Sequence, residues 1–260
     1  MRLYCTYVSL LIKSHMQHKT SFLLTAAAQF CAPFTALAGI YFLFERFGSI
    51  QGYTLYEVLM CFAVVGMCFA ISTCAARGFD AFPNMVRTAA FDRVLVRPRG
   101  CVLQVLGSGF DLKRIGHLIQ ASAVLFVAVT RADISWDAVK IVILINMLIG
   151  GSLIFSGVYM LQAAAAFWTL DALEFANIFT HGIKEHASYP LNIFPKWITV
   201  FFTFIIPYGT VNYLPLQFLT GRVSGNGRLI ALIPLAGALF IAPCYMFWRY
   251  GVRKYTSAGS

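Results

Sequence analysis

Charged residues are scarce in this sequence. Asp, Glu, Lys and Arg make up 12% of its 260 residues, and hydrophobic residues make up 59%. Soluble domains contain roughly 25% charged and about 45–50% apolar residues. This composition excludes a soluble domain and predicts an all-α protein that crosses a membrane several times.

Acidic residues are the scarcer of the two charged kinds. There are 10 of them against 20 Lys and Arg, which gives a formal net charge of +10. In a soluble protein this excess would suggest nucleic acid as a partner. In a membrane protein it has a simpler cause, because Lys and Arg are retained in cytoplasmic loops during insertion. We therefore expect the lipid bilayer, and no nucleic acid, as a partner.

Motifs that bind metals or nucleotides are missing. The seven cysteines include no C-x-x-C pair, so neither a zinc site nor a disulfide framework is predicted. No G-x-x-x-x-G-K-[ST] phosphate-binding loop occurs, and the nearest candidate, Gly107-Ser108-Gly109, lacks a Lys at the right distance. We expect no cofactor in this chain. If ATP drives its work, another polypeptide binds the nucleotide.

Ionisable residues are nearly absent from the interior of the apolar runs. Glu57 lies near one end of a run, and Asp111 and His117 lie near one end of another. Carriers coupled to protons or ions are expected to have more acidic residues inside their membrane spans. A pathway through this protein would be mainly apolar and aromatic, since the chain has 24 Phe and 12 Tyr, and would suit hydrophobic or amphiphilic cargo. Glu57 is retained as a candidate pathway residue.

Six apolar runs are present, each a candidate membrane span. The third is the shortest, and an alternative start near Val102 is left open for it. The segment before the first run alternates basic and apolar residues at helical spacing, which is typical of a helix in the membrane interface. We expect it to be retained as part of a single transmembrane domain (1–260). Its parts are an interface helix at 1–19, spans at 20–44, 54–76, 115–130, 141–168, 197–219 and 229–248, and a basic connector at 77–114.

The distribution of basic residues predicts the orientation. Six spans place both termini on one side of the membrane, and five of the 20 Lys and Arg then fall on the other side. The remaining 15 lie with the termini and the connector. Because cytoplasmic segments carry the excess of Lys and Arg, we expect both termini in the cytoplasm.

The basic connector contains a short helical pattern. Phe91, Val94 and Leu95 form an apolar stripe beside basic residues, and Arg97-Pro98 ends the pattern. Such a helix can dock a cytoplasmic partner through apolar anchors and charge complementarity. The alternative is that it only anchors the connector in the membrane interface. The residues we expect at this interface are Phe91, Asp92, Arg93, Val94, Leu95, Arg97 and Arg99.

Two of the later runs have distinctive residues. The fourth is rich in Gly, Ser and Ala, including Gly150 and Gly151, which let neighbouring helices approach closely. The fifth is broken by Pro207 and Pro215, with polar or aromatic residues between them. A broken run fits a helix followed by a re-entrant piece. Its candidate pathway or re-entrant residues are Pro207, Asn212, Tyr213 and Pro215.

The polar stretch after the fourth run supports a different function. His181, Glu185 and His186 lie close together in it, although their spacing is not the H-E-x-x-H of metalloproteases. The alternative hypothesis is therefore a membrane protein without a transport role. It would be an intramembrane enzyme that uses these three residues, or a scaffold.

Several short motifs together resemble a known family. Over nearly its whole length the chain is similar to the membrane subunits of ABC transporters of the ABC type-2 permease class, in the branch of the daunorubicin-type multidrug exporter permeases. The resemblance rests on F-D-R-V-L-V-R-P-R-G (Phe91–Gly100), F-W-T-L-D-A-L-E-F-A-N (Phe167–Asn177), Y-P-L-N-I-F-P-K-W (Tyr189–Trp197), I-P-Y-G-T-V-N-Y-L-P (Ile206–Pro215) and W-R-Y-G-V-R-K-Y-T-S-A-G-S (Trp248–Ser260).

The resemblance implies a fold and a function. The family fold has six helices, an N-terminal interface helix, a coupling helix between spans two and three, and a re-entrant element between spans five and six. Two permeases, identical or different, would sit on two ATPase subunits that bind ATP and Mg. The chain would not be an enzyme by itself. It would move its substrate out of the cell through the plasma (inner) membrane, as in multidrug efflux.

Overall fold

The computed structural model describes residues 2–169, 180 and 182–256. Within these residues the secondary structure is helical, apart from one isolated bridge between Ile50 and Tyr53. The α-helices are α1 (Arg2–Gln17), α2 (Lys19–Cys31), α3 (Phe34–Phe47), α4 (Leu55–Asp80), α5 (Phe82–Arg87), α6 (Ala90–Leu95), α7 (Cys101–Ser108), α8 (Ile115–Arg131), α9 (Ala138–Ala165), α11 (Lys196–Val200), α12 (Leu214–Leu219), α13 (Gly227–Leu232) and α14 (Ala236–Lys254). Shorter turns are the 3₁₀ segments η1 (Leu112–Arg114), η2 (Leu191–Ile193) and η5 (Ile233–Leu235), and the π-helical segments η3 (Phe201–Ile205) and η4 (Gly209–Tyr213).

Five helices of the described chain are long and apolar enough to cross a membrane. They overlap the predicted spans one to four and six. The predicted fifth span is instead a pair of helical pieces, Lys196–Ile205 and Gly209–Leu219, bent by 93° at the break between them. Counting the bent pair as one span gives up to six. The prediction of an all-α, multi-span fold is thus confirmed.

Two predicted helices have different limits in the structure. The first span is divided into α2 and α3 at Ala32-Pro33, because proline has no backbone N–H for the helical ladder. The alternative start of the third span near Val102 is wrong. Residues 101–108 form the separate helix α7, and the chain turns between Gly109 and Asp111 before α8 begins.

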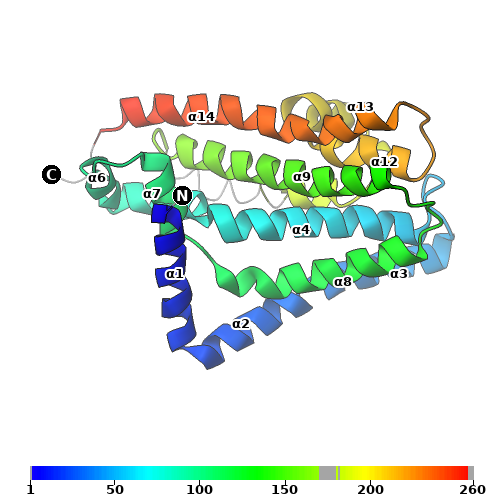
Figure 1. The fold of residues 1–260 in the computed structure, drawn as a ribbon, viewed down its shortest axis with the longest axis horizontal. Helices are drawn as coiled ribbons and strands as arrows, with labels where there is room; N and C mark the ends of the chain where they lie inside the picture. Colours follow the sequence, from blue (N-terminus) through cyan, green and yellow to red (C-terminus); the bar gives the residue numbers. More distant parts are fainter. Residues whose placement is uncertain (1, 170–179, 181, 257–260) are drawn as a thin grey trace.

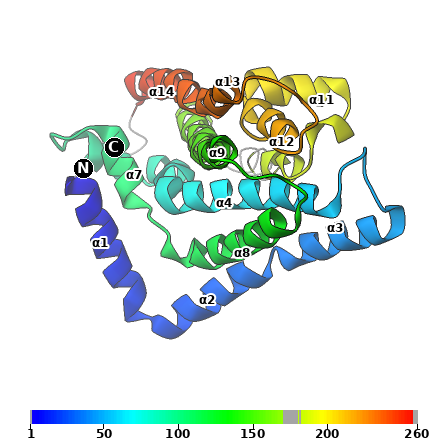
Figure 2. The same ribbon diagram turned by 45° about the vertical axis from the view of Figure 1, so that its right-hand side comes forward.

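Helix α4 lies at the centre of the bundle. It packs between α8 and α9, while α14 covers α9 and the α2–α3 pair runs along α8 (Figures 1 and 2). Helix α1 turns away from α2 after His18, so that the two form a wide angle. One end of the bundle carries α1, α5, α6 and α7 together with the last turns of α14.

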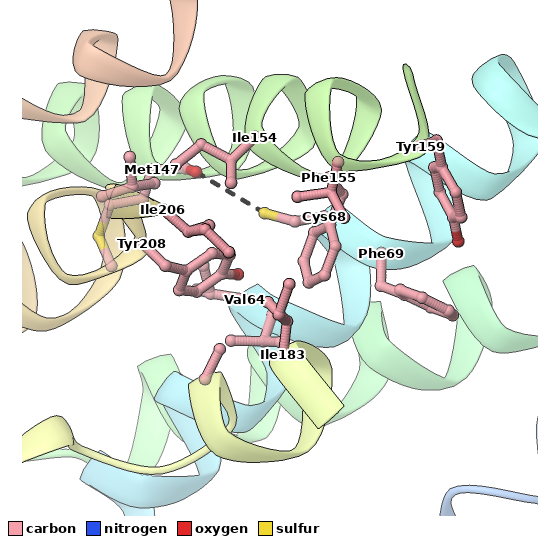
Figure 3. Packing of buried hydrophobic residues seen from close by; sticks show 14 of the residues in the cluster. Val64, Cys68, Phe69, Met147, Ile154, Phe155, Tyr159, Ile183, Ile206 and Tyr208 are labelled. Carbon is pink, nitrogen blue, oxygen red and sulfur yellow. Dashed lines mark hydrogen bonds between the residues drawn. The ribbon is translucent and has the colours of Figure 1, made fainter. Parts of the chain in front are cut away.

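The core is formed where α4 meets α9. Cys68 and Phe69 of α4 lie against Phe155 of α9, and Tyr208 approaches from the bent segment (Figure 3). All four side chains are at most 2% exposed. The Phe69 and Phe155 rings meet edge to face with centroids 5.5 Å apart, a geometry that aromatic pairs prefer.

Small residues allow the close helix crossings that the sequence predicts for α9. A Cβ on Gly151 would lie 2.6 Å from the Cys68 sulfur, so α4 and α9 could not keep their separation with a larger residue there. On the other face of α9, a Cβ on Gly237 would overlap the Gly150 carbonyl oxygen. Helix α14 therefore contacts α9 backbone to backbone.

This crossing gives a test of the fold. Gly237→Val is expected to separate α14 from α9 and to lower the free energy of unfolding by about 3 kcal/mol, because neither backbone can yield. Gly39→Val is the matched control, since no atom lies within 4 Å of a Cβ placed there. Thermal unfolding of the purified chain measures both, and an equal effect of the two substitutions would contradict the crossing.

Candidate functional site

Helix α6 is the short helix that the connector was predicted to contain. It begins after Ala89, whose φ of 53° lies in the left-handed region, and its first turn carries Asp92. It ends at Leu95, shortly before Pro98, which cannot continue a helix. With α5 and α7 on either side, it forms the compact end of the connector (Figure 1).

The inner side of α6 is held by an aromatic cluster, which we define as Phe82, Phe91, Phe167, Trp248 and Tyr255. The Phe91 ring is fully buried, with its centroid 4.9 Å from that of Phe82, 5.1 Å from Tyr255 and 5.7 Å from Phe167. Trp248 closes the cluster, 4.7 Å from Phe82. These side chains come from α5, α6, the turn that follows α9, and α14 with its C-terminal cap residue. The cluster thus connects the connector to the membrane-spanning helices.

Two polar contacts fix α6 further. The Tyr255 hydroxyl donates to an Asp92 carboxylate oxygen at 2.8 Å. The buried Gln104 amide, on α7, donates to the carbonyl oxygens of Val94 at 3.1 Å and Arg99 at 3.0 Å. One amide therefore holds both the end of α6 and the loop that follows it.

The outer side of the same segment is basic and partly apolar. Leu95 is 40% exposed and Val96 is 85% exposed. Arg93, Arg97 and Arg99 are exposed beside them, and the Arg97 guanidinium donates to the Tyr7 hydroxyl of α1 at 3.2 Å. We call Arg93, Leu95, Val96, Arg97 and Arg99 the connector surface. It has the composition of a docking surface, with apolar contacts surrounded by charges.

The structure corrects the orientation of the predicted apolar stripe. Phe91 and Val94 are buried in their own chain, at 0% and 7% exposure, and cannot be anchors for a partner while α6 is in place. Residues three apart on a helix share a face, and that face turns inward here. Leu95 points outward as expected. The predicted contact of this segment with a partner stays a prediction.

The sequence analysis missed residues on both sides of α6. Val96 is not part of the predicted interface, because it lies after the apolar stripe. It is exposed beside Leu95, since each residue along a helix turns its side chain to a new face. Phe167 and Trp248 were noted only within family motifs. Their role depends on contacts between distant parts of the chain, and no local pattern could have identified it.

Glu57, the candidate pathway residue of α4, has a structural role at the opposite end of the bundle. Its carboxylate accepts the Thr54 backbone N–H at 2.7 Å in a capping box, and it pairs with Arg222 at 2.8 Å. The Arg222 guanidinium also lies 4.0 Å from the Tyr53 ring centroid, and burial raises the pKa of Tyr53. Glu57 thus ties the loop before α4 to the loop before α13.

The bent segment contains the remaining candidate residues. Pro207 lies at the break, and Pro215 is buried in the first turn of α12. Asn212 is buried, and its amide donates to the Ala187 carbonyl oxygen at 3.1 Å, while Tyr213 accepts a hydrogen bond from Gln217 at 2.8 Å. Pro207 at the break explains why this run does not form one straight helix.

Two of the three residues of the alternative enzyme hypothesis lie within the described structure. His181 lies outside the described residues. Glu185 is exposed, and His186 Nδ1 bonds the Gly182 carbonyl oxygen at 2.8 Å while its ring stacks on Phe202. No group of three metal-ligating side chains occurs among the residues that the structure describes.

Lys184 is a charged residue that the sequence analysis did not place among the spans. Its ammonium lies 5.1 Å from the ring centroid of Phe69, near the middle of α4. His117 of α8 is also buried, with its ring centroid 6.1 Å from that of Phe69. The interior is therefore less uniformly apolar than the sequence predicted.

A groove of about 470 Å³ lies between α3, α4 and α8. Its walls are apolar and aromatic, and its polar lining groups are the Gln120 amide and the Tyr41 hydroxyl. The composition fits a hydrophobic ligand or a lipid chain.

A family model described as ABC-2 family transporter protein matches residues 30–259. No curated protein matches the chain. The matched range covers the bundle from the end of α2 onward, including the connector surface and the aromatic cluster.

Proposed function

The chain belongs to the family of ABC-2 transporter proteins, and from that premise we propose that it exports hydrophobic or amphiphilic molecules, using ATP hydrolysed by a separate ATPase subunit. The family makes it a multi-pass membrane protein and the permease subunit of an ABC transporter. The observation that carries the proposal is the connector surface, which is exposed for a partner while the aromatic cluster joins it to the spanning helices. Its own sequence has no phosphate-binding loop.

The mechanism follows from how α6 is held. The ATPase would contact Arg93, Leu95 and Arg97, and closure of the ATPase on ATP would push α6. Because Phe91 is enclosed by residues of α14 and the end of α9, the displacement would pass to those helices as one unit. The chain itself would catalyse no reaction, and ATP and Mg would be bound by the partner.

The proposed orientation puts α1, the connector and both termini in the cytoplasm. The excess of Lys and Arg in these segments supports it. So does their position, since α1, α6 and the last turns of α14 lie at one end of the bundle (Figure 1). The membrane would be the plasma (inner) membrane.

The composition of the complex is the second part of the proposal. Two permease subunits, identical or different, would pair and bind two copies of the ATPase. The motifs from Phe91–Gly100 to Trp248–Ser260 support a place among the daunorubicin-type multidrug exporters. The apolar groove between α3, α4 and α8 supports the class of cargo.

Purification from native membranes tests the function. The chain is expected to co-purify with an ATP-hydrolysing subunit, which mass spectrometry identifies. Inside-out vesicles that contain the complex are expected to accumulate a hydrophobic dye only when ATP is present. A chain that purifies without an ATPase, or dye uptake that ATP does not change, would contradict the proposal.

A further inference from the structure

A second cavity, of about 410 Å³, is lined by residues of α1, α2, α4, the end of α7 and the loop before α8. Helices α1 and α2 form a wide angle (Figure 2). Leu11 of α1 and Gln29 of α2 form one wall, and the C-terminal end of α4 and the loop before α8 form the other. The volume falls within the range of about 300–1,000 Å³ that is typical of small-molecule sites. The cavity lies at the same end of the bundle as α6.

The cavity is strongly basic. Arg77, Lys113 and Arg114 line it, against a single carboxylate, Asp111. Arg77 forms an ion pair with Asp111, and the Arg114 guanidinium donates to the Gln29 side-chain oxygen at 3.0 Å. The Lys113 ammonium makes no hydrogen bond or ion pair with any residue that the structure describes. Two positive charges in excess therefore face one space.

The two hydroxyl groups of the lining already donate hydrogen bonds within the chain. The Thr25 hydroxyl donates to the Ser21 carbonyl oxygen at 2.7 Å, and the Ser108 hydroxyl donates to that of Val105 at 2.7 Å. Besides the Gln29 side-chain amide N–H group, the side-chain donors left for a ligand are cationic. Such donors fit an anion with several acceptor oxygens, and a phosphate group in particular.

The position of the cavity indicates where such a phosphate comes from. Helix α1 has the basic and apolar pattern of a helix that lies in the membrane interface. Leu11 and Phe110 form an apolar part of the cavity lining, beside the basic residues. Helix α8 begins just after Arg114, and the positive end of its dipole points toward the same region. Basic pockets at the cytoplasmic ends of spanning helices suit lipid headgroups.

We propose that this cavity binds the phosphate headgroup of an anionic phospholipid. Lys113 and Arg114 supply the main contacts, and Arg77 adds a third positive charge, part of which Asp111 neutralises. The site depends on the membrane location of the chain and not on export. Loss of lipid binding and loss of transport can therefore be told apart.

The test uses the purified full-length chain in detergent. Its thermal unfolding midpoint is measured against increasing short-chain phosphatidylglycerol, short-chain phosphatidylcholine or inorganic phosphate. Phosphatidylglycerol alone is expected to raise the midpoint. Lys113→Gln with Arg114→Gln is expected to weaken its apparent affinity by about 25-fold, since each cation near a membrane surface contributes about 1 kcal/mol, or roughly fivefold.

Matched variants separate this site from general charge effects. Arg87→Gln removes one exposed positive charge of α5 outside the cavity and is expected to leave the lipid response unchanged. Lys113→Arg keeps the charge and should keep the response, while Lys113→Gln alone should lose about fivefold. If the double variant does not fold, the comparison of Lys113→Arg with Lys113→Gln tests the proposal. Equal midpoints with phosphatidylcholine or inorganic phosphate, or an unaltered response in Lys113→Gln, would overturn the proposal.

Discussion

A complex that carries Arg93→Glu and Arg97→Glu is expected to lose its ATPase subunit. Both side chains are exposed at the outer side of α6, beside Leu95 and Val96. Charges of the wrong sign at an interface cost several kcal/mol. Even about 2 kcal/mol would weaken the association roughly thirtyfold. The amount of ATPase that co-purifies with the tagged permease measures the loss.

Two controls make this result specific. Arg131→Glu with Arg228→Glu is the same double change on exposed residues at the opposite end of the bundle, and it should leave the ATPase bound. Tyr7→Phe removes the hydroxyl that Arg97 contacts without changing any charge. As a control, it should also leave the ATPase bound. If the first double variant still binds the ATPase and responds to cargo, the connector surface is not the docking site.

Phe91→Ala is expected to uncouple ATP hydrolysis from cargo without dissociating the ATPase from the permease. The substitution empties the centre of the aromatic cluster, and loss of a buried Phe costs about 3–5 kcal/mol. Helix α6 would then be free to move relative to Trp248 and Phe167. The ATPase should remain bound through the exposed arginines, but cargo should no longer stimulate ATP hydrolysis. Comparing ATP hydrolysis with and without a hydrophobic dye shows this directly.

The control for this variant is another Phe→Ala change. Phe126 of α8 is 71% exposed and faces away from the core, so Phe126→Ala should leave stimulation intact. Phe91→Leu, which restores most of the volume, should recover part of the coupling. Full stimulation in Phe91→Ala would show that the aromatic cluster does not transmit movement.

The sequence predicted the elements whose cause is local. Long apolar runs gave α4, α8 and α9, because backbone groups in lipid must be satisfied within a helix. The predicted break at Pro207 also depends on neighbouring residues. The 93° bend could not be predicted, since a proline permits a break but packing sets the angle.

The candidate site was predicted only in part. The basic and apolar pattern located α6, and Arg97-Pro98 indicated its end. Which face turns inward depends on Trp248 and Tyr255, far along the chain. The same limit applies to Lys184, which packs on Phe69 although its segment reads as non-spanning. Contacts between distant segments decide both cases.

The aromatic cluster also has a consequence for the order of synthesis. Tyr255, whose hydroxyl bonds Asp92, is made 163 residues after it. During translation α6 leaves the ribosome long before α14 exists, so Phe91 then has neither Trp248 nor Tyr255 to enclose it. Helix α6 therefore gains its contacts with Trp248 and Tyr255 only once the last span has been made. In the proposed complex, ATPase binding at α6 would then favour a finished subunit over a truncated chain.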